Sequence, residues 1–212
     1  MAVMNVNPTR MQLSKLKRQL TTAVRGHKML KDKRDELMRQ FLDLVRETRD
    51  LREKVETELV RCNAHFVNAS AVMSKEALDA SLLSPKQQIN VEIGSKNVMS
   101  VEIPQFETNT RTTDKGDIFP YGFAFTSFEL DDAVMSLDEL MPDLIKLAQY
   151  EKSCELMSAE IEKTRRRVNA LEYVMIPQFD EAIHNIQMKL EENERGNTSR
   201  LMKTKEMLAK EA

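Results

Sequence analysis

The sequence predicts a mostly α-helical protein, in which long N- and C-terminal helices form an antiparallel two-helix coiled coil, with a small β-hairpin-containing middle segment between them in the sequence. The 212 residues include only 5 Gly and 6 Pro, so long uninterrupted elements are expected. Charged residues make up 31% of the chain and aromatic residues only 5%, which is typical of coiled coils and unfavourable for a large globular core. Apolar residues recur with alternating spacings of three and four in both halves, the pattern of a coiled-coil seam.

The pattern divides the chain into three segments. Residues 1–84 form the N-terminal long helix of the coiled coil, residues 85–125 a β-hairpin and aromatic middle segment, and residues 126–212 the C-terminal long helix. The first helix has two possible starts: Asn7 as N-cap with Pro8 at the first helical position, or a competing capping box of Thr9 and Gln12. A helix from about 8 to 80 would extend about 105 Å, and Pro85 ends it.

The seam of the first helix is a stripe of apolar residues on one face. A histidine on that stripe, His27, is expected to be packed or hydrogen-bonded rather than to bind a ligand, and Arg34 and Thr48 are expected to fix the register. The seam residues proposed for the first helix are Leu16, Leu20, Leu30, Leu37, Phe41, Leu44 and Leu51.

The middle segment carries two short runs in which apolar and polar residues alternate, 89–93 and 98–103, as in the strands of a β-hairpin. Residues 94–97 lie between the runs and are the expected turn, while 104–118 are polar and rich in turn-forming residues. The apolar hairpin residues are Ile89, Val91, Ile93, Val98, Val101 and Ile103. Five aromatic residues follow and are expected to form a small satellite core: Phe119, Tyr121, Phe123, Phe125 and Phe128.

The second helix is predicted to start near a capping box at Thr126–Glu129. Pro142 and Pro177 each remove a backbone hydrogen bond and are expected to bend the helix, and Gly196 with Asn197 frays or breaks its end. Its seam includes Ile161, Val168, Leu171 and Met175.

Two helices of similar length joined by a compact middle segment must fold back antiparallel. With the midpoint near residue 104, the basic stretch 10–34 lies beside 174–198, give or take a heptad. This register places Cys62 near residue 146 and Cys154 near residue 54. The two cysteines are then too far apart to bond, and buried free thiols are expected.

Charge is distributed unevenly although the net charge is only −2. Residues 1–34 hold nine basic side chains against the single acid Asp32. A run of three arginines at 165–167 fans around roughly half of its helix, while Thr164 and Val168 are free to face a partner helix. A solvated basic face is the common explanation of any single charge run, and no nucleic-acid-binding motif accompanies these residues.

The motifs of catalysis are missing from the sequence. It contains no phosphate-binding glycine loop, no cysteine and histidine spacing of a zinc site and no nucleophile motif, so we expect neither an enzyme nor a bound cofactor or metal. It also contains neither a signal-peptide core nor a run of 18 apolar residues, so direct membrane insertion is not expected.

Two long motifs in a fixed order resemble one protein family. They are Asn7 to Arg10 followed by Arg25 to Lys33 near the start, and Glu162 to Tyr173 followed by Ile176-Pro177 near the end. Together with the long helices and the small β element, they resemble the D subunit of the V-type (A/V-type) ATPases and ATP synthases in its bacterial or archaeal form. The resemblance covers essentially the whole chain, although the middle segment is similar in type more than in residues.

The resemblance implies a non-catalytic rotor shaft in the central stalk, which transmits torque between ATP chemistry and ion movement. The implied partners are the F subunit of the central stalk, the hexamer of A and B subunits that binds nucleotide, and the socket protein (the C or d subunit) above the membrane ring. The implied location is the cytoplasmic face of the membrane. Neither proton versus sodium transport nor pump versus synthase direction follows from this chain.

Six basic residues of the two motifs, together with one glycine, are the expected contacts between rotor and stator: Arg25, Gly26, Lys28, Lys31, Arg165, Arg166 and Arg167. Gly26 costs about 1 kcal/mol relative to alanine in a helix interior, so it either admits a close neighbouring helix or is simply tolerated. The resemblance further implies that the hairpin projects near the F subunit and influences ATP hydrolysis. Two other interpretations remain: a prefoldin-like chaperone, which also joins coiled helices through hairpins, and a generic coiled-coil tether.

Overall fold

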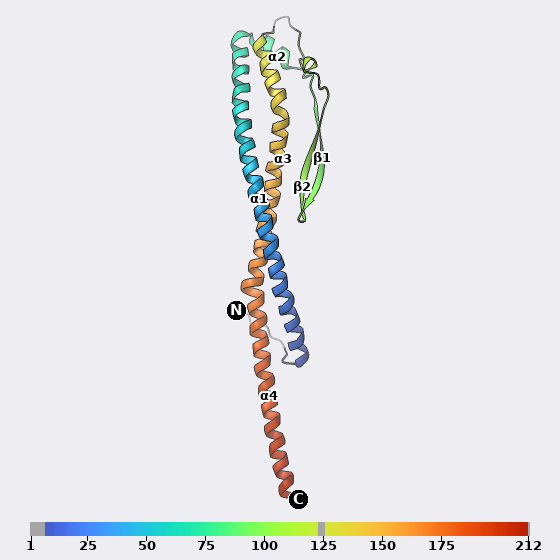
Figure 1. Ribbon diagram of the computed structural model, residues 1–212, viewed down its shortest axis with the longest axis vertical. Coiled ribbons are helices and arrows are strands. Elements are labelled where there is room, and N and C mark those ends of the chain that lie inside the picture. Colours follow the sequence, from blue (N-terminus) through green and yellow to red (C-terminus); the bar gives the residue numbers. More distant parts are fainter. Residues whose placement is uncertain (1–6, 123–125, 212) are drawn as a thin grey trace. The chain divides into compact units, whose positions relative to one another are not determined.

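The computed structural model describes residues 7–122 and 126–211, and it confirms the predicted fold class (Figure 1). In chain order, a long N-terminal helix and a long C-terminal helix flank a two-stranded antiparallel sheet. The elements are α1 (Arg10–Val72), α2 (Lys75–Leu82), β1 (Ile89–Val98), β2 (Val101–Thr110), the 3-10 turn η1 (Lys115–Asp117), α3 (Phe128–Ala170), the π-helical turn η2 (Leu171–Met175) and α4 (Ile176–Glu211).

The chain forms two compact units, and α1 and α3 each contribute to both. The terminal unit consists of Met1–Glu36 and Ile161–Ala212, and the middle unit consists of Leu37–Glu160. Among the described residues, no helix combines the length and the apolarity that crossing a membrane requires.

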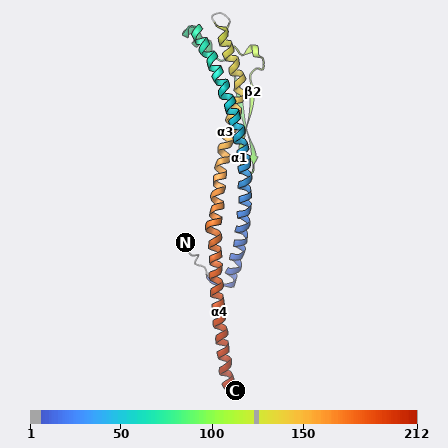
Figure 2. The ribbon, with the colours of Figure 1, turned by 60° about the vertical axis from the view of Figure 1, so that its left-hand side comes forward.

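The terminal unit packs the start of α1 antiparallel against α4. Thr9 caps α1, because its Oγ1 accepts a hydrogen bond from the backbone N–H of Gln12 at 3.2 Å; this favours the second of the two predicted starts. Arg10 forms an ion pair with Glu194. Between them lies a core of buried residues: Leu16, Ala23, Phe179, Ala182, Ile183 and Ile186. Beyond this core, α4 runs on past the first turn of α1 (Figure 2).

The π-helical turn η2 ends at Met175, two residues before Pro177. The backbone N–H of Ile176 donates to the carbonyl of Leu171, five residues back, instead of four. A proline ring clashes with the carbonyl four residues earlier and offers no N–H, so a widened turn at this point accommodates Pro177 without ending the helix. Neither Pro142 nor Gly196 ends its helix: α3 continues through Pro142, and α4 continues through Gly196.

In the middle unit the first helix is divided, where the sequence predicted a single helix to about residue 80. α1 ends at Val72, and Ser74 starts α2 by accepting a hydrogen bond from the N–H of Ala77 at 3.3 Å. This break lets α2 turn back, so that buried Leu78 packs with Ala69 and Leu130 in a second small core. A capping serine followed by an acid in the first turn is a helix-start signal strong enough to restart the chain here.

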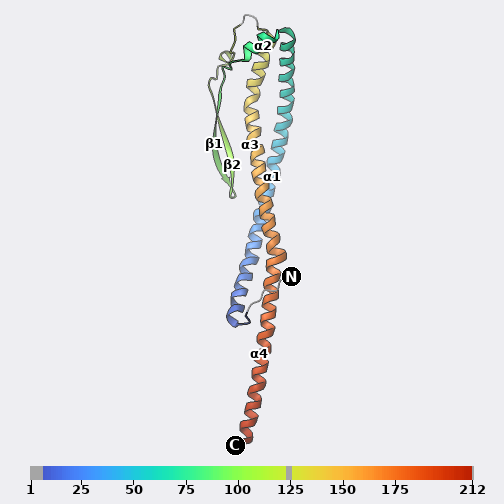
Figure 3. The ribbon, with the colours of Figure 1, turned by 180° about the vertical axis from the view of Figure 1, so that it is seen from behind.

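The hairpin is confirmed, but the predicted turn position is wrong. β1 and β2 pair from Ile89 with Thr110 to Val98 with Val101, which places the two-residue turn at Met99 and Ser100 instead of 94–97. Both turn residues have positive φ angles, 50° and 71°, as tight hairpin turns require. The hairpin lies along α3 (Figures 1 and 3), where the N–H of Phe106 donates to Gln149 Oε1 at 3.0 Å. The pairing of two ten-residue strands that pack on α3 therefore decides where the turn lies, although residues 94–97 favour a turn locally.

The helix register also differs from the prediction in the middle unit. Arg52 pairs with Glu151, within a heptad of its predicted partner, whereas the Sγ of Cys62 lies 3.6 Å from the carbonyl oxygen of Ala133 instead of near residue 146. The reason is that α1 ends at Val72 and α3 begins at Phe128, so the chain turns around residue 100 and not 104. Both cysteines are free, Cys62 buried and Cys154 half-buried.

The aromatic satellite core forms only in part. The rings of Phe119 and Tyr121 lie 5.9 Å apart, and Tyr121 packs beside Leu130 and donates its hydroxyl to Asp131 at 2.9 Å. Phe128 does not join them, because as the first residue of α3 it points outward and is 74% exposed. Phe123 and Phe125 lie outside the described residues.

Candidate partner-binding surface

All seven predicted contact residues lie in the terminal unit. Arg25, Lys28 and Lys31 are exposed on α1, and no ion pair joins them to any residue in the ranges 7–122 and 126–211. Gly26 is half-buried beside them. These three cations are therefore available to an external anionic group.

The arginine triplet occupies the outward side of α3. Thr164 and Val168 are both buried, whereas Arg165, Arg166 and Arg167 are exposed. Arg166 forms an ion pair with Glu162 one turn earlier, in which both side chains are more than half exposed. An ion pair of this kind contributes about 0–1 kcal/mol, so a partner's carboxylate can replace it at little cost.

The two groups of cations occupy neighbouring stretches of the terminal unit. His27, between Arg25 and Lys28, places its Nε2 3.4 Å from the Oε2 of Glu172. Glu172 follows Arg167 by five residues, which is roughly 8 Å along a helix. We call the seven residues together the basic surface: Arg25, Gly26, Lys28, Lys31, Arg165, Arg166 and Arg167.

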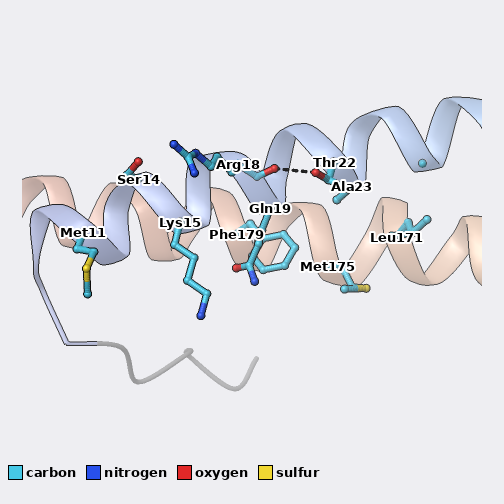
Figure 4. A pocket seen from close by; sticks show the side chains of 11 residues that line it. Met11, Ser14, Lys15, Arg18, Gln19, Thr22, Ala23, Leu171, Met175 and Phe179 are labelled. Carbon is cyan, nitrogen blue, oxygen red and sulfur yellow. Dashed lines mark hydrogen bonds between the residues drawn. The ribbon is translucent and has the colours of Figure 1, made fainter.

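A groove of about 790 Å³ adjoins the basic surface between α1 and the start of α4 (Figure 4). The ring of Phe179 and the side chain of Gln19 lie in the space between the helices, with Lys15 and Arg18 along the rim. Gly26 also lines the groove, and a Cβ added there would meet no described heavy atom within 4 Å. There is therefore room beside the Cα of Gly26 for an added methyl group.

The proposed seam residues differ in burial along the chain. Leu16, Leu37, Ile161 and Val168 are buried, while the half-buried members are Leu20, Leu30, Phe41, Leu44, Leu51 and Leu171. Met175 is 41% exposed at the end of the π-helical turn, where the widened turn shifts the phase of the apolar stripe. Thr48 donates its hydroxyl to the carbonyl of Leu44 at 2.7 Å within its own helix.

The last turns of α4 carry an exposed apolar surface that the sequence analysis did not identify. Leu201, Met202, Met207 and Leu208 are between 57% and 70% exposed. These apolar residues are visible in the sequence, but only the structure shows that α4 continues to Glu211 and that the four side chains are not covered by any other residue among those described. Large exposed apolar groups of this kind commonly mark contact sites for another protein.

The hairpin residues belong to the middle unit, whereas the basic surface belongs to the terminal unit. Val101 is buried, Ile89, Val98 and Ile103 are half-buried, and Val91 and Ile93 are exposed. The exposed fraction of Ile93 reaches 74%. One strand of the hairpin therefore offers apolar side chains to the outside.

Comparison with known proteins gives one consistent result. A family model described as the D subunit of ATP synthase matches residues 12–206. The chain is 58% identical to the V-type ATP synthase D subunit of Acetivibrio thermocellus over 212 residues, covering 100% of this chain and 96% of that protein. Identity is 56% to the D subunit of Clostridium botulinum strain Alaska E43, with 98% of both chains covered, and 54% to that of Clostridioides difficile, with 100% of this chain and 95% of that protein covered.

Proposed function

The chain belongs to the family of ATP synthase D subunits, and we propose that it acts as the central-stalk rotor shaft of a rotary V/A-type ATPase. In this role it transmits torque between ATP hydrolysis or synthesis in the A/B hexamer and ion translocation in the membrane ring. The chain itself is a non-catalytic component, and nucleotide binds to the A and B subunits.

The observation that carries this proposal is the basic surface: exposed cations flanking a packed helical seam in the terminal unit. A shaft must touch its bearing at every angle without a bond strong enough to arrest it. Exposed ion pairs are worth about 0–1 kcal/mol each, so they exchange readily between successive positions. Arg25, Lys28, Lys31 and the outward members of the arginine triplet meet acidic loops of the hexamer in this proposal.

The other partners follow from the same family membership. The F subunit accompanies the shaft in the central stalk, and the socket protein (the C or d subunit) holds the shaft above the membrane rotor ring. The complex lies on the cytoplasmic face of the membrane, where the shaft is a peripheral component.

Charge reversal of the basic surface tests this function. A variant with Arg25, Lys28 and Arg165 changed to glutamate is expected to assemble but to lose most rotation-coupled ATP hydrolysis, because like charges then face each other across the bearing. A matched control reverses two exposed cations of the middle unit, Arg46 and Arg49, and is expected to retain activity. Unchanged turnover of the basic-surface variant would exclude a coupling role for these residues.

Stoichiometry tests the shaft assignment independently. Native mass spectrometry of this chain co-expressed with its A, B and F subunits is expected to give three A, three B, one F and one copy of this chain, since only a central shaft enters a hexamer once. If a properly formed A/B hexamer fails to incorporate the chain, the shaft assignment is wrong.

The hairpin supports a second, regulatory contribution within the same complex. Val91 and Ile93 are exposed on β1, and neither belongs to the seam of the coiled coil. Replacing residues 89–110 by a short linker is expected to change the rate of ATP hydrolysis more than the thermal stability of the chain. Loss of folding in that variant would show that the hairpin is a structural element instead.

A further inference from the structure

His65, Glu129 and Asp132 converge in the middle unit although they are far apart in the sequence. Their potential ligand atoms, one imidazole nitrogen and two carboxylate oxygens, all lie within 4.8 Å of one another, and all three residues are half-buried. His65 comes from α1, and the two acids come from the first turns of α3. Residues three apart share one face of a helix, so Glu129 and Asp132 both face the histidine.

Packing on both sides holds the two helices together at this cluster. One turn after His65, Ala69 is completely buried against Leu130, which lies between the two acids in sequence. One turn before it, buried Cys62 approaches the carbonyl of Ala133 at 3.6 Å. The three side chains therefore project from backbone segments that are already fixed, which is the condition for a preorganised site.

The polar atoms of the cluster are not used elsewhere. No hydrogen bond or ion pair joins the side chain of His65, Glu129 or Asp132 to another residue in the described part of the chain. The neighbouring acid, Asp131, is by contrast occupied by the hydroxyl of Tyr121 and takes no part. Three converging ligand atoms without competing partners point to an external group that binds all of them.

We propose that His65, Glu129 and Asp132 form a binding site for a divalent transition-metal ion of the Zn²⁺ type, with water completing the coordination. One imidazole and two carboxylates are ligands that Zn²⁺ takes at about 2.0–2.2 Å. Tetrahedral coordination sets ligand atoms roughly 3.4 Å apart, so side-chain rotations that bring the three atoms closer by at most about 1.4 Å complete the site. A set with one nitrogen and only two carboxylates does not suit Ca²⁺, which takes six to eight oxygen ligands.

The bound ion links α1 to α3 near the point where the chain reverses direction. It adds a cross-link between two helices that otherwise meet here through apolar contacts such as that of Ala69 with Leu130. All of its ligands belong to the middle unit, whereas the basic surface belongs to the terminal unit. The site does not depend on the proposed rotor function, because every ligand comes from this chain.

Direct binding to the purified full-length chain tests the site. Titration with Zn²⁺ by calorimetry, and with Co²⁺ by its visible absorption, is expected to give about one ion per chain. The imidazole resonances of His65 are expected to shift at the same metal concentration. A melting temperature that rises with Zn²⁺ would show that the ion binds the folded state.

Two variants and one control make the result specific. Asp132→Asn keeps the side-chain volume and is expected to lower the affinity at least tenfold, and His65→Ala is expected to abolish both the Co²⁺ absorption and the rise in melting temperature. His184→Ala, which removes an exposed histidine of α4, is expected to bind as the parent chain does. Failure of the parent chain to bind an ion, or equal binding by Asp132→Asn, would overturn the proposal.

Discussion

Replacing Gly26 by alanine is predicted to stabilise the isolated chain. Gly26 lies inside α1 with an ordinary negative φ angle, and an added Cβ meets no described heavy atom within 4 Å. The substitution therefore brings no clash and removes the conformational entropy that glycine loses on folding. Alanine is favoured over glycine in a helix interior by about 0.8–1 kcal/mol.

Thermal unfolding followed by circular dichroism measures this gain. For a cooperative unit of 150–250 residues, 1 kcal/mol corresponds to a rise in melting temperature of about 2–4 °C. Gly196 is a matched control, because it too lies inside a helix with open space around its Cα. Gly196→Ala should give a similar rise.

A melting temperature of Gly26→Ala that stays constant or falls, while Gly196→Ala rises, would refute the reasoning. It would mean that a neighbouring group approaches Gly26 more closely than the structure shows. In the assembled complex the same variant has a second use. If a partner packs into the groove at Gly26, coupled ATP hydrolysis should fall even though the isolated chain becomes more stable.

Three further predictions concern the middle unit. The pKa of Asp117 lies below its usual 3.8, chiefly because Lys86 donates a hydrogen bond to its carboxylate. The ion pair therefore stabilises the base of the hairpin above pH 3.8, and this stabilisation is lost as the pH falls through the lowered pKa. Hydrogen exchange of the hairpin should accelerate in that acidic range in the parent chain but not in Asp117→Asn. Burial raises the pKa of the Cys62 thiol, so alkylation of Cys62 at pH 8 should be much slower in the folded chain than in the denatured chain. Mass spectrometry measures both rates, and equal rates would contradict the burial of Cys62. Gln149→Ala leaves the N–H of Phe106 without its acceptor on α3. The rate of hydrogen exchange at the Phe106 amide should therefore rise several-fold, with little change in melting temperature. An unchanged exchange rate would show that other contacts hold the hairpin against α3.

The sequence predicted local features well where a periodic pattern or a capping residue decides them. The 3-4 spacing identified both long helices, the alternation of 89–93 identified a hairpin, and Thr9 with Gln12 was one of the two predicted starts of α1, the one that the structure favours. The resemblance carried by the two motifs agrees with the family match over residues 12–206. Whether the basic surface contacts a stator stays a prediction, because exposure alone does not show what binds there.

Several features depended on contacts between distant residues and were beyond the reach of local patterns. The hairpin turn lies at Met99 and Ser100 because of how the two strands pair and pack along α3, although the residues 94–97 favour a turn more strongly by themselves. The π-helical turn before Pro177 reflects how a helix accommodates a proline when its neighbours hold it in place.

By itself, the sequence determined the class of fold, the two long helices and the family, because repeating apolar spacing and extended motifs are properties of the chain read residue by residue. The tertiary structure alone decided the helix register, the open space beside Gly26 and the meeting of His65 with Glu129 and Asp132. The facing pairs of the middle unit depend on where α1 stops and α3 begins. A shift of a few residues at that reversal changes every one of these pairs, and although Ser74 is a local signal for the start of α2, no local pattern encodes how α1 and α3 pair.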